Sequence, residues 1–181
     1  GAKLYSVTES DLTYIKNIPA DNEGTTLKTT VHDVVFSPDG KTFCLSLNIA
    51  VYIGENLKHI GAKMYSIQGT DITFIQDIEN ITYCASNMAF SPNGNFLAFS
   101  TEFHVRVFSV SDTLLKHNSY LCADNLYEPL IGIFGRDIET ISFSPDGEMI
   151  VVGGRFKNVA KIYKKVPYID EKTGEYNLRF N

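Results

Sequence analysis

Short runs in which apolar and polar residues alternate follow one another along most of the chain, which is the pattern of half-buried β-strands. One such pair, HDVVF (32–36) and TFCLSL (42–47), flanks a Ser-Pro-Asp-Gly segment. Proline presets a turn backbone, and Asp-Gly supplies residues that tolerate positive φ, so the stretch predicts a tight β-hairpin. Strand-forming Val, Ile, Thr, Tyr and Phe are plentiful, whereas runs of Ala and Leu are scarce.

This strand–turn–strand segment occurs three times. VVFSPDG at 34–40 returns as MAFSPNG at 88–94 and as ISFSPDG at 141–147, so the closing glycines are 54 and 53 residues apart. We expect the phenylalanine of each copy to point inward beside its turn. The residues assigned to the repeated turn are Phe36, Pro38, Asp39, Gly40, Phe90, Pro92, Asn93, Gly94, Phe143, Pro145, Asp146 and Gly147.

A second phrase recurs with a similar period. GAKLYSVTESDLTYIKNI at 1–18 matches GAKMYSIQGTDITFIQDI at 61–78, and weaker copies lie at 105–117 and 160–178. Each copy has a strand centred on Tyr or Phe, a polar turn and a second short strand. The two phrases alternate along the chain and together supply four antiparallel strands per unit.

Four antiparallel strands that repeat about every 50 residues are typical of a β-propeller blade. The units fall at 1–18, which is half a blade, and at 31–78, 83–117 and 138–180. Residues 1–181 therefore predict one all-β region of about three and a half blades. A single blade cannot bury both of its faces, and closed propellers have about four to eight blades.

Three and a half blades predict part of a larger or multi-chain propeller. The ring can be completed by further segments of a longer chain, by further subunits, or by a partner that adds strands to the terminal blades. We favour the first of these because the sequence enters its repeat midway and opens on Gly1 rather than on methionine.

The units differ in four segments, 19–30, 49–60, 117–137 and 155–165, and the last two supply the candidate partner-binding residues. The connection at 117–137 is long and rich in aromatic residues, and the segment at 155–165 is basic. Connections between blades carry binding surfaces in such folds, but a plain surface insertion and a solvated blade edge explain the same residues. The candidate residues are Tyr120, Tyr127, Phe134, Arg155, Lys157, Lys161 and Lys164.

Composition narrows the function classes. The chain of 181 residues is 44% hydrophobic, which allows a sizeable core, and its net charge of -5 argues against binding nucleic acid through a broad basic face. No apolar run reaches the roughly 20 residues of a membrane span. The three cysteines are widely spaced, and none of the four histidines lies at ligand spacing from another histidine or a cysteine. We expect isolated thiols and no metal site.

The sequence carries no catalytic signature. Neither a G-x-S-x-G elbow nor a P-loop occurs. Asp39 and Asp146 lie inside Pro-Asp-Gly turns, where a turn-forming role explains them. The Gly153-Gly154 pair ends a predicted strand, and a β-bulge or a tight turn explains it better than phosphate binding does. We therefore expect neither catalytic residues nor a cofactor.

The sequence resembles the WD-repeat family of β-propellers. The best match is FSPNGNFLAFSTEFHVRVFS (90–109), in which Ser100, Glu102, Arg106 and Phe108 fall where that family often has Ser, Asp, Arg and Trp. The Trp-Asp and Gly-His dipeptides of the family do not occur. The resemblance implies stacked propeller blades that present loops and edges to other proteins.

A narrower resemblance is to WD-like repeat arrays in tail and virion proteins of bacteriophages. It rests on FSPDGEMIVVGGRFKNVAKIYKK (143–165) and LYSVTESDLTYIKNI (4–18). This resemblance implies a non-enzymatic structural or protein–protein interaction module, an assembly component of a virion or tail. Its partners would be other proteins of a large assembly.

Two alternatives stay open. A cellular WD-type scaffold or adaptor protein, in the cytoplasm, would use the same blades to bind other proteins. Propellers also host hydrolases and lactonases, whose sites lie at the central channel with His, Asp or Glu converging from several blades. Here the equivalent positions of the units do not repeat such residues. We expect no membrane association, and nucleic-acid binding would rest on residues 155–165 alone.

Overall fold

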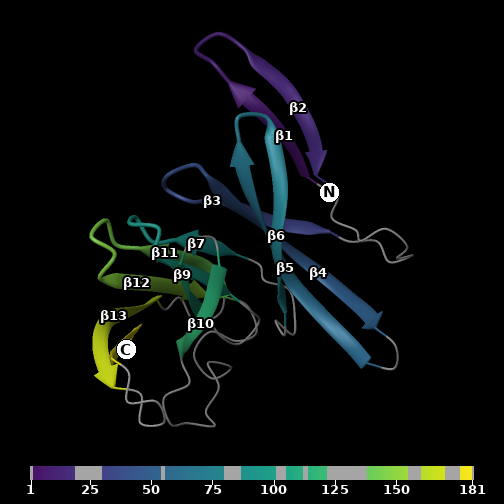
Figure 1. The fold of residues 1–181 in the computed structure, drawn as a ribbon. Coiled ribbons are helices and arrows are strands. Elements are labelled where there is room, and N and C mark those ends of the chain that lie inside the picture. Colours follow the sequence, from purple (N-terminus) through teal and green to yellow (C-terminus); the bar gives the residue numbers. More distant parts are fainter. Residues whose placement is uncertain are drawn as a thin grey trace.

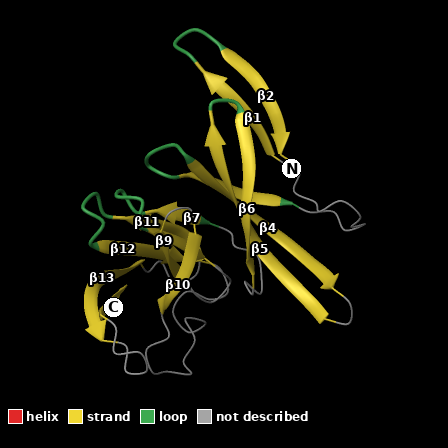
Figure 2. Cartoon of the chain, viewed as in Figure 1, coloured by secondary structure: helices red, strands yellow, loops and turns green. Residues whose placement is uncertain are grey.

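The structure is built from antiparallel β-strands (Figure 1), and Figure 2 shows no helix in the described part of the chain. The computed structural model describes residues 2–18, 30–53, 56–79, 87–100, 105–111, 114–121, 138–154, 160–169 and 176–180. The strands are β1 (Ala2–Val7), β2 (Leu12–Ile18), β3 (Val31–Phe36), β4 (Thr42–Ile53), β5 (Asn56–Gln68), β6 (Asp71–Glu79), β7 (Met88–Phe90), β8 (Phe96–Ser100), β9 (Val105–Ser111), β10 (Leu114–Leu121), β11 (Ile138–Phe143), β12 (Met149–Gly154), β13 (Ala160–Ile169) and β14 (Tyr176–Phe180).

The strands form three four-stranded sheets and one two-stranded sheet, each paired in chain order. We call β1–β2 the half-blade, β3–β6 the first full blade, β7–β10 the second and β11–β14 the third. The innermost strands of the three full blades are β3, β7 and β11, and β7 contacts both of the others. The predicted all-β propeller fold of about three and a half blades is confirmed, and its sheets do not close into a ring (Figure 1).

The cores lie between blades, because the middle strands bury side chains on both faces. All five residues of β8 are buried. Phe96 and Ala98 pack with the third full blade, whereas Leu97 and Phe99 pack with the first. Successive side chains of a strand point to opposite faces, so one blade contributes to two cores. This geometry explains why FLAFS is an uninterrupted apolar run rather than an alternating one.

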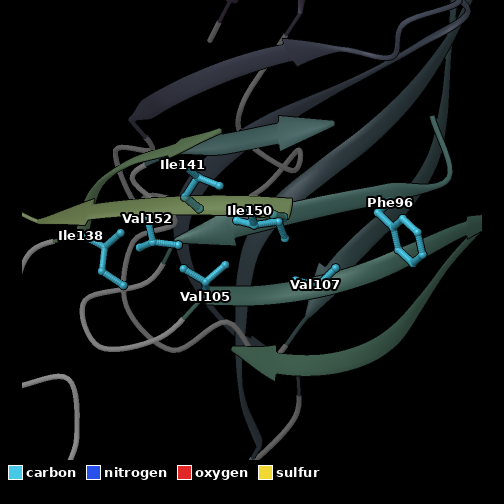
Figure 3. Packing of buried hydrophobic residues seen from close by; sticks show 8 residues of the cluster. Phe96, Val105, Val107, Ile138, Ile141, Ile150 and Val152 are labelled. Atoms are coloured by element: carbon cyan, nitrogen blue, oxygen red, sulfur yellow. The ribbon is translucent and has the colours of Figure 1, made fainter. Parts of the chain in front are cut away.

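Three interblade cores hold the stack together. The first lies between the half-blade and the first full blade, the second between the first and second full blades, and the third between the second and third (Figure 3). The buried members of the first core are Leu4, Ile18, Phe43, Leu45, Leu47 and Tyr65. Those of the second are Cys44, Ala62, Met64, Ile78, Met88, Leu97, Phe99 and Phe108. Those of the third are Phe96, Ala98, Val105, Val107, Ile138, Ile141, Ile150 and Val152.

The three turn phenylalanines differ in burial. Phe90 packs against the second core and Phe143 against the third. Phe36 is instead 46% exposed, and the ring centroid of Phe43 lies 5.5 Å from its own. The expectation that Phe36 points into a core is wrong, because no inner strands are described in the half-blade to cover this part of β3.

A close contact fixes the inner hairpin of the third full blade. The register between β11 and β12 shifts between Ile138 and Thr140, opposite Gly153 and Gly154. Of the β-bulge or tight turn expected at this glycine pair, the structure shows a bulge, and it lies on the partner strand β11. A Cβ at position 153 would lie 2.7 Å from Thr140 Cγ2, so packing requires glycine there.

We predict that Gly153→Ala lowers the free energy of unfolding by about 1–3 kcal/mol, the usual range for overpacking a core. Thr140→Ser removes the methyl group that the new Cβ would meet, so the double variant Thr140→Ser/Gly153→Ala should recover most of the loss. Urea unfolding of the two single variants and the double variant measures both effects. Equal stability of Gly153→Ala and the unchanged protein would contradict the packing argument.

Candidate functional site

The three repeated turns share one set of hydrogen bonds. In the first, Ser37 Oγ donates to Asp39 Oδ1 at 2.6 Å and accepts from Thr42 N at 3.0 Å. Lys41 N also donates to Asp39 Oδ1, at 3.0 Å. The second turn makes the same bonds through Asn93 Oδ1, and the third makes them through Asp146 Oδ1. The side chain after the proline thus acts as an acceptor inside its own turn, whether it is charged or neutral.

Neighbouring turns also pack against each other. A Cβ at Gly94 would lie 3.7 Å from Pro38 Cδ, and a Cβ at Gly147 would lie 3.7 Å from Pro92 Cδ. The backbone φ angles of these glycines are +75° and +72°, in the left-handed region that favours glycine. The turns therefore line up at one end of the blades, each proline beside the glycine of the next turn.

A groove of about 560 Å³ lies between the first two turns. Its lining residues are Ser37, Pro38, Asp39, Lys41, Thr42, Pro92, Asn93, Gly94, Asn95 and Val110. The Asp39 and Asn93 side chains are already engaged within their turns. The hydroxyl of Ser37 and the amide of Lys41 hold the pKa of Asp39 below its ordinary value, so this carboxyl is suited to accept hydrogen bonds and not to act as a general acid.

The opposite end of the inner strands carries a second set of polar groups. His32 on β3 and Glu139 on β11 are both exposed, and each lies eight residues before the glycine of its turn. They therefore occupy the same repeat position in the first and third full blades. Asp33 follows His32, and its Oδ2 accepts a hydrogen bond of 2.7 Å from Met88 N at the start of β7. A histidine, an aspartate and a glutamate thus lie on the innermost strands.

Sequence reasoning missed His32 and Glu139 as a pair. The two residues are far apart in the chain, and no local motif joins them. The signal that could have found them is the phase of the repeat, because counting back from Gly40 and Gly147 places them in register. Repeat position, and not spacing along the chain, decides which side chains meet near a propeller axis.

The predicted partner-binding residues are not gathered into one described surface. The side chain of Tyr120, on β10, and the whole of Tyr127, Phe134, Arg155 and Lys157 lie outside the described part of the structure. Lys161 pairs with Val152, and Lys164 with Met149, so the two lysines lie on opposite faces of β13. Lys165 forms an ion pair with Glu148. A partner-binding role for these residues stays a prediction.

Other buried titratable groups serve the fold. Cys44 is buried in the second core, and burial raises the pKa of its thiol, which keeps it protonated. Burial, and then the charge of Asp77, raises the pKa of Tyr65 in the first core. Within the described ranges, no three His, Cys, Asp or Glu side chains form a group that could hold a metal ion. The described residues also include no helix that could cross a membrane.

The fold resembles solved structures of β-propeller type. One is a protein from Lactobacillus plantarum, with a TM-score of 0.63 and 17% identity over 98% of this chain and 47% of its own. Another is a functionally unknown protein from Desulfotomaculum acetoxidans, with a TM-score of 0.56 and 21% identity over 97% of this chain and 47% of its own. A third is the periplasmic gluconolactonase PpgL from Pseudomonas aeruginosa, with a TM-score of 0.53 and 15% identity over 82% of this chain and 41% of its own.

These comparisons define what the chain shares with other proteins. At 15% to 21% identity, the likeness establishes the fold. The chain spans about half the length of the solved structures that it matches. No protein-family model matches the sequence, and a search of curated proteins found no match.

The comparisons correct the expected identity. The expected relationship to WD-repeat proteins and to bacteriophage tail or virion proteins is contradicted, because the solved structures that the fold resembles include a periplasmic gluconolactonase. The expectation of a non-enzymatic module, whether a virion component or a cellular WD-type scaffold, is contradicted by the enzyme among these neighbours. The Ser-Pro-Asx-Gly turn suggested the wrong family because tight hairpins in unrelated propellers favour the same turn residues.

We predict that the two turn aspartates make stability depend on pH below about 4. Hydrogen bonds from Ser37 and Ser144 hold the pKa of Asp39 and of Asp146 below the ordinary value of 3.8. Their contribution to stability is therefore present above that value and is lost as the pH falls through the folded-state pKa. Between pH 6 and pH 3, the thermal midpoint of the double variant Asp39→Asn/Asp146→Asn should fall less than that of the unchanged protein.

At neutral pH, we expect the double variant to have nearly the same thermal midpoint as the unchanged protein. The reason is that Asn93 already makes the two equivalent hydrogen bonds in the second turn. Asp71→Asn, at an exposed aspartate outside the three repeated Ser-Pro-Asx-Gly turns, is the matched control. Its thermal midpoint should fall between pH 6 and pH 3 as much as that of the unchanged protein. An unchanged acid response in the double variant would show that the turn carboxylates do not carry it.

Proposed function

We propose that this chain supplies blades to a propeller hydrolase that opens a sugar lactone. The observation that carries the proposal is the repeat placement of His32 and Glu139, exposed on two innermost strands, with Asp33 beside the first. The resemblance to a gluconolactonase of the same fold supports the choice of substrate class. Activity of the whole protein also requires the blades that complete the propeller around its axis, since this chain covers 41% of that enzyme.

Lactone hydrolysis needs the groups that these positions offer. A base removes a proton from water as its oxygen attacks the carbonyl carbon, the ring C–O bond breaks, and an acid returns a proton to the departing alkoxide. Histidine suits the first role because its ordinary pKa lies close to neutral pH. In this scheme His32 is the base, and the carboxylate of Glu139 accepts hydrogen bonds from the water or from substrate hydroxyls.

The inner strands provide the rigidity that such a site requires. The bond from Met88 N to Asp33 Oδ2 ties β3 to β7 directly beside His32. On β11, Ile138 and Ile141 are buried on either side of Glu139 in the third core. Both candidate side chains therefore project from strands held by packing or by hydrogen bonds, which limits their movement during the reaction.

We predict that the intact natural polypeptide hydrolyses δ-gluconolactone faster than the spontaneous reaction. His32→Ala should lower kcat by about 100-fold or more, the range expected for loss of general base catalysis. Glu139→Gln should lower kcat/KM, because the neutral amide keeps the shape but loses the charge. Titration of the released acid at constant pH, corrected for spontaneous opening, measures each rate.

Ser142→Ala is the matched control, since Ser142 is exposed on the same strand as Glu139. Its rate should equal that of the unchanged protein. Hydrolysis no faster than the spontaneous rate, or full activity in both His32→Ala and Glu139→Gln, would rule out the proposed site.

A further inference from the structure

His32 and Glu139 are the extra residues of two β-bulges. The register of β3 against β4 shifts between Val31 and Asp33, so His32 between them has no partner on β4. The register of β11 against β12 shifts in the same way and leaves out Glu139. A bulge changes the direction of the side chain at its extra residue, and bulges are common next to active sites. The same repeat position is therefore bulged in two blades, and both times it carries a candidate site residue.

Asp33, which follows the first bulge, accepts two backbone hydrogen bonds through its two carboxylate oxygens. Oδ1 accepts from Val34 N on the same strand at 2.8 Å. Oδ2 accepts from Met88 N at the start of β7, in the next blade, at 2.7 Å. Hydrogen bonds to an ionised carboxylate are roughly twice as strong as those between neutral groups. The carboxylate of Asp33 therefore holds the bulge of β3 against the neighbouring inner strand.

The other two full blades have different residues at the repeat position of Asp33. Asn87 occupies it in the second full blade and Thr140 in the third. In the second blade, Asn87 N donates to Ser100 Oγ at 2.9 Å, which is a bond within that blade. Asparagine and threonine thus both fit this position of a blade. Among these three residues, Asp33 is the one whose side chain bonds to a described residue of a neighbouring blade.

The strand that Asp33 binds lies between the strands of the two candidate residues. β7 contacts both β3, which carries His32, and β11, which carries Glu139. A displacement of β3 relative to β7 would therefore move His32 relative to Glu139. The bond from Met88 N to Asp33 opposes that displacement at the position next to His32.

We propose that Asp33 is a positioning residue of the candidate site, which fixes the bulge that presents His32. Its carboxylate oxygens are engaged with Val34 N and Met88 N, so Asp33 acts through His32 and not on the substrate. The catalytic consequence rests on the proposed function, because the position of His32 affects a rate if His32 is the base. The effect of Asp33 on the position of His32 does not depend on any reaction.

The test variant is Asp33→Asn, which keeps the shape of the side chain but offers one acceptor oxygen to two N–H donors. Asn87 at the same repeat position shows that a blade accommodates asparagine there. In the intact natural polypeptide, Asp33→Asn should lower kcat for δ-gluconolactone by about tenfold or more and change KM by less than about twofold. The reason is that the base is displaced while the groups that bind the substrate are kept.

Two NMR measurements on the same polypeptide do not require hydrolysis. With isotope-labelled methionine, the amide proton of Met88 should exchange with solvent faster in Asp33→Asn than in the unchanged protein. With isotope-labelled histidine, the ring of His32 should become more mobile. Leu97→Val is the matched control, because Leu97 is buried in the second core between the same two blades. It should lower the thermal midpoint but leave kcat and the mobility of the His32 ring unchanged.

Unchanged exchange at Met88 or unchanged mobility of the His32 ring in Asp33→Asn would overturn the inference. An equal loss of kcat in Leu97→Val would also overturn it, because lower stability would then explain the rate. If the unchanged protein does not hydrolyse the lactone, the proposed function fails, and the two NMR measurements still decide whether Asp33 positions His32. Amide exchange in the third full blade shows whether each variant remains folded.

Discussion

Burial between blades is the constraint on which the rest of this structure depends. The middle strands are apolar on both faces, and Phe43, Cys44 and Leu45 are each at most 1% exposed. Fully burying a Leu or Phe side chain contributes about 1.5–3 kcal/mol, so a blade that lost one neighbour would lose a large part of its stability. The blades consequently fold and persist as a stack, in which each interface stabilises the two blades that form it.

The repeated turn keeps this stack in register at one end. Its serine and Asx side chains satisfy their own hydrogen bonds locally, so the turn does not depend on a partner blade for polar contacts. Neighbouring blades contact each other there because the proline of one turn lies beside the glycine of the next turn. The turn therefore repeats because the hairpin and its neighbour both require it, and a ligand is not needed to explain it.

The sequence was sufficient to predict the fold because its signals are local and repeated. The alternation of residues, the Ser-Pro-Asx-Gly turns and the duplicated outer hairpin each indicate antiparallel strands without reference to tertiary contacts. The burial of Phe36 could not be predicted in this way, since it depends on whether a neighbouring hairpin covers it. The family was misjudged for a related reason, because the most visible motif reports turn geometry and says little about chemistry.

The candidate site was missed because its members are related by the repeat and not by a motif. In the first full blade, the residue next to His32 is Asp33, whose carboxylate is committed to the hydrogen bond that joins two inner strands. His32 itself is exposed and belongs to none of the three interblade cores, and the same holds for Glu139. This position can therefore change its side chain from blade to blade without loss of packing. The repeated turns stay constant, whereas the side chains at the opposite end of the inner strands can vary from blade to blade. Residues that differ between units can therefore meet at that end and form a reactive site.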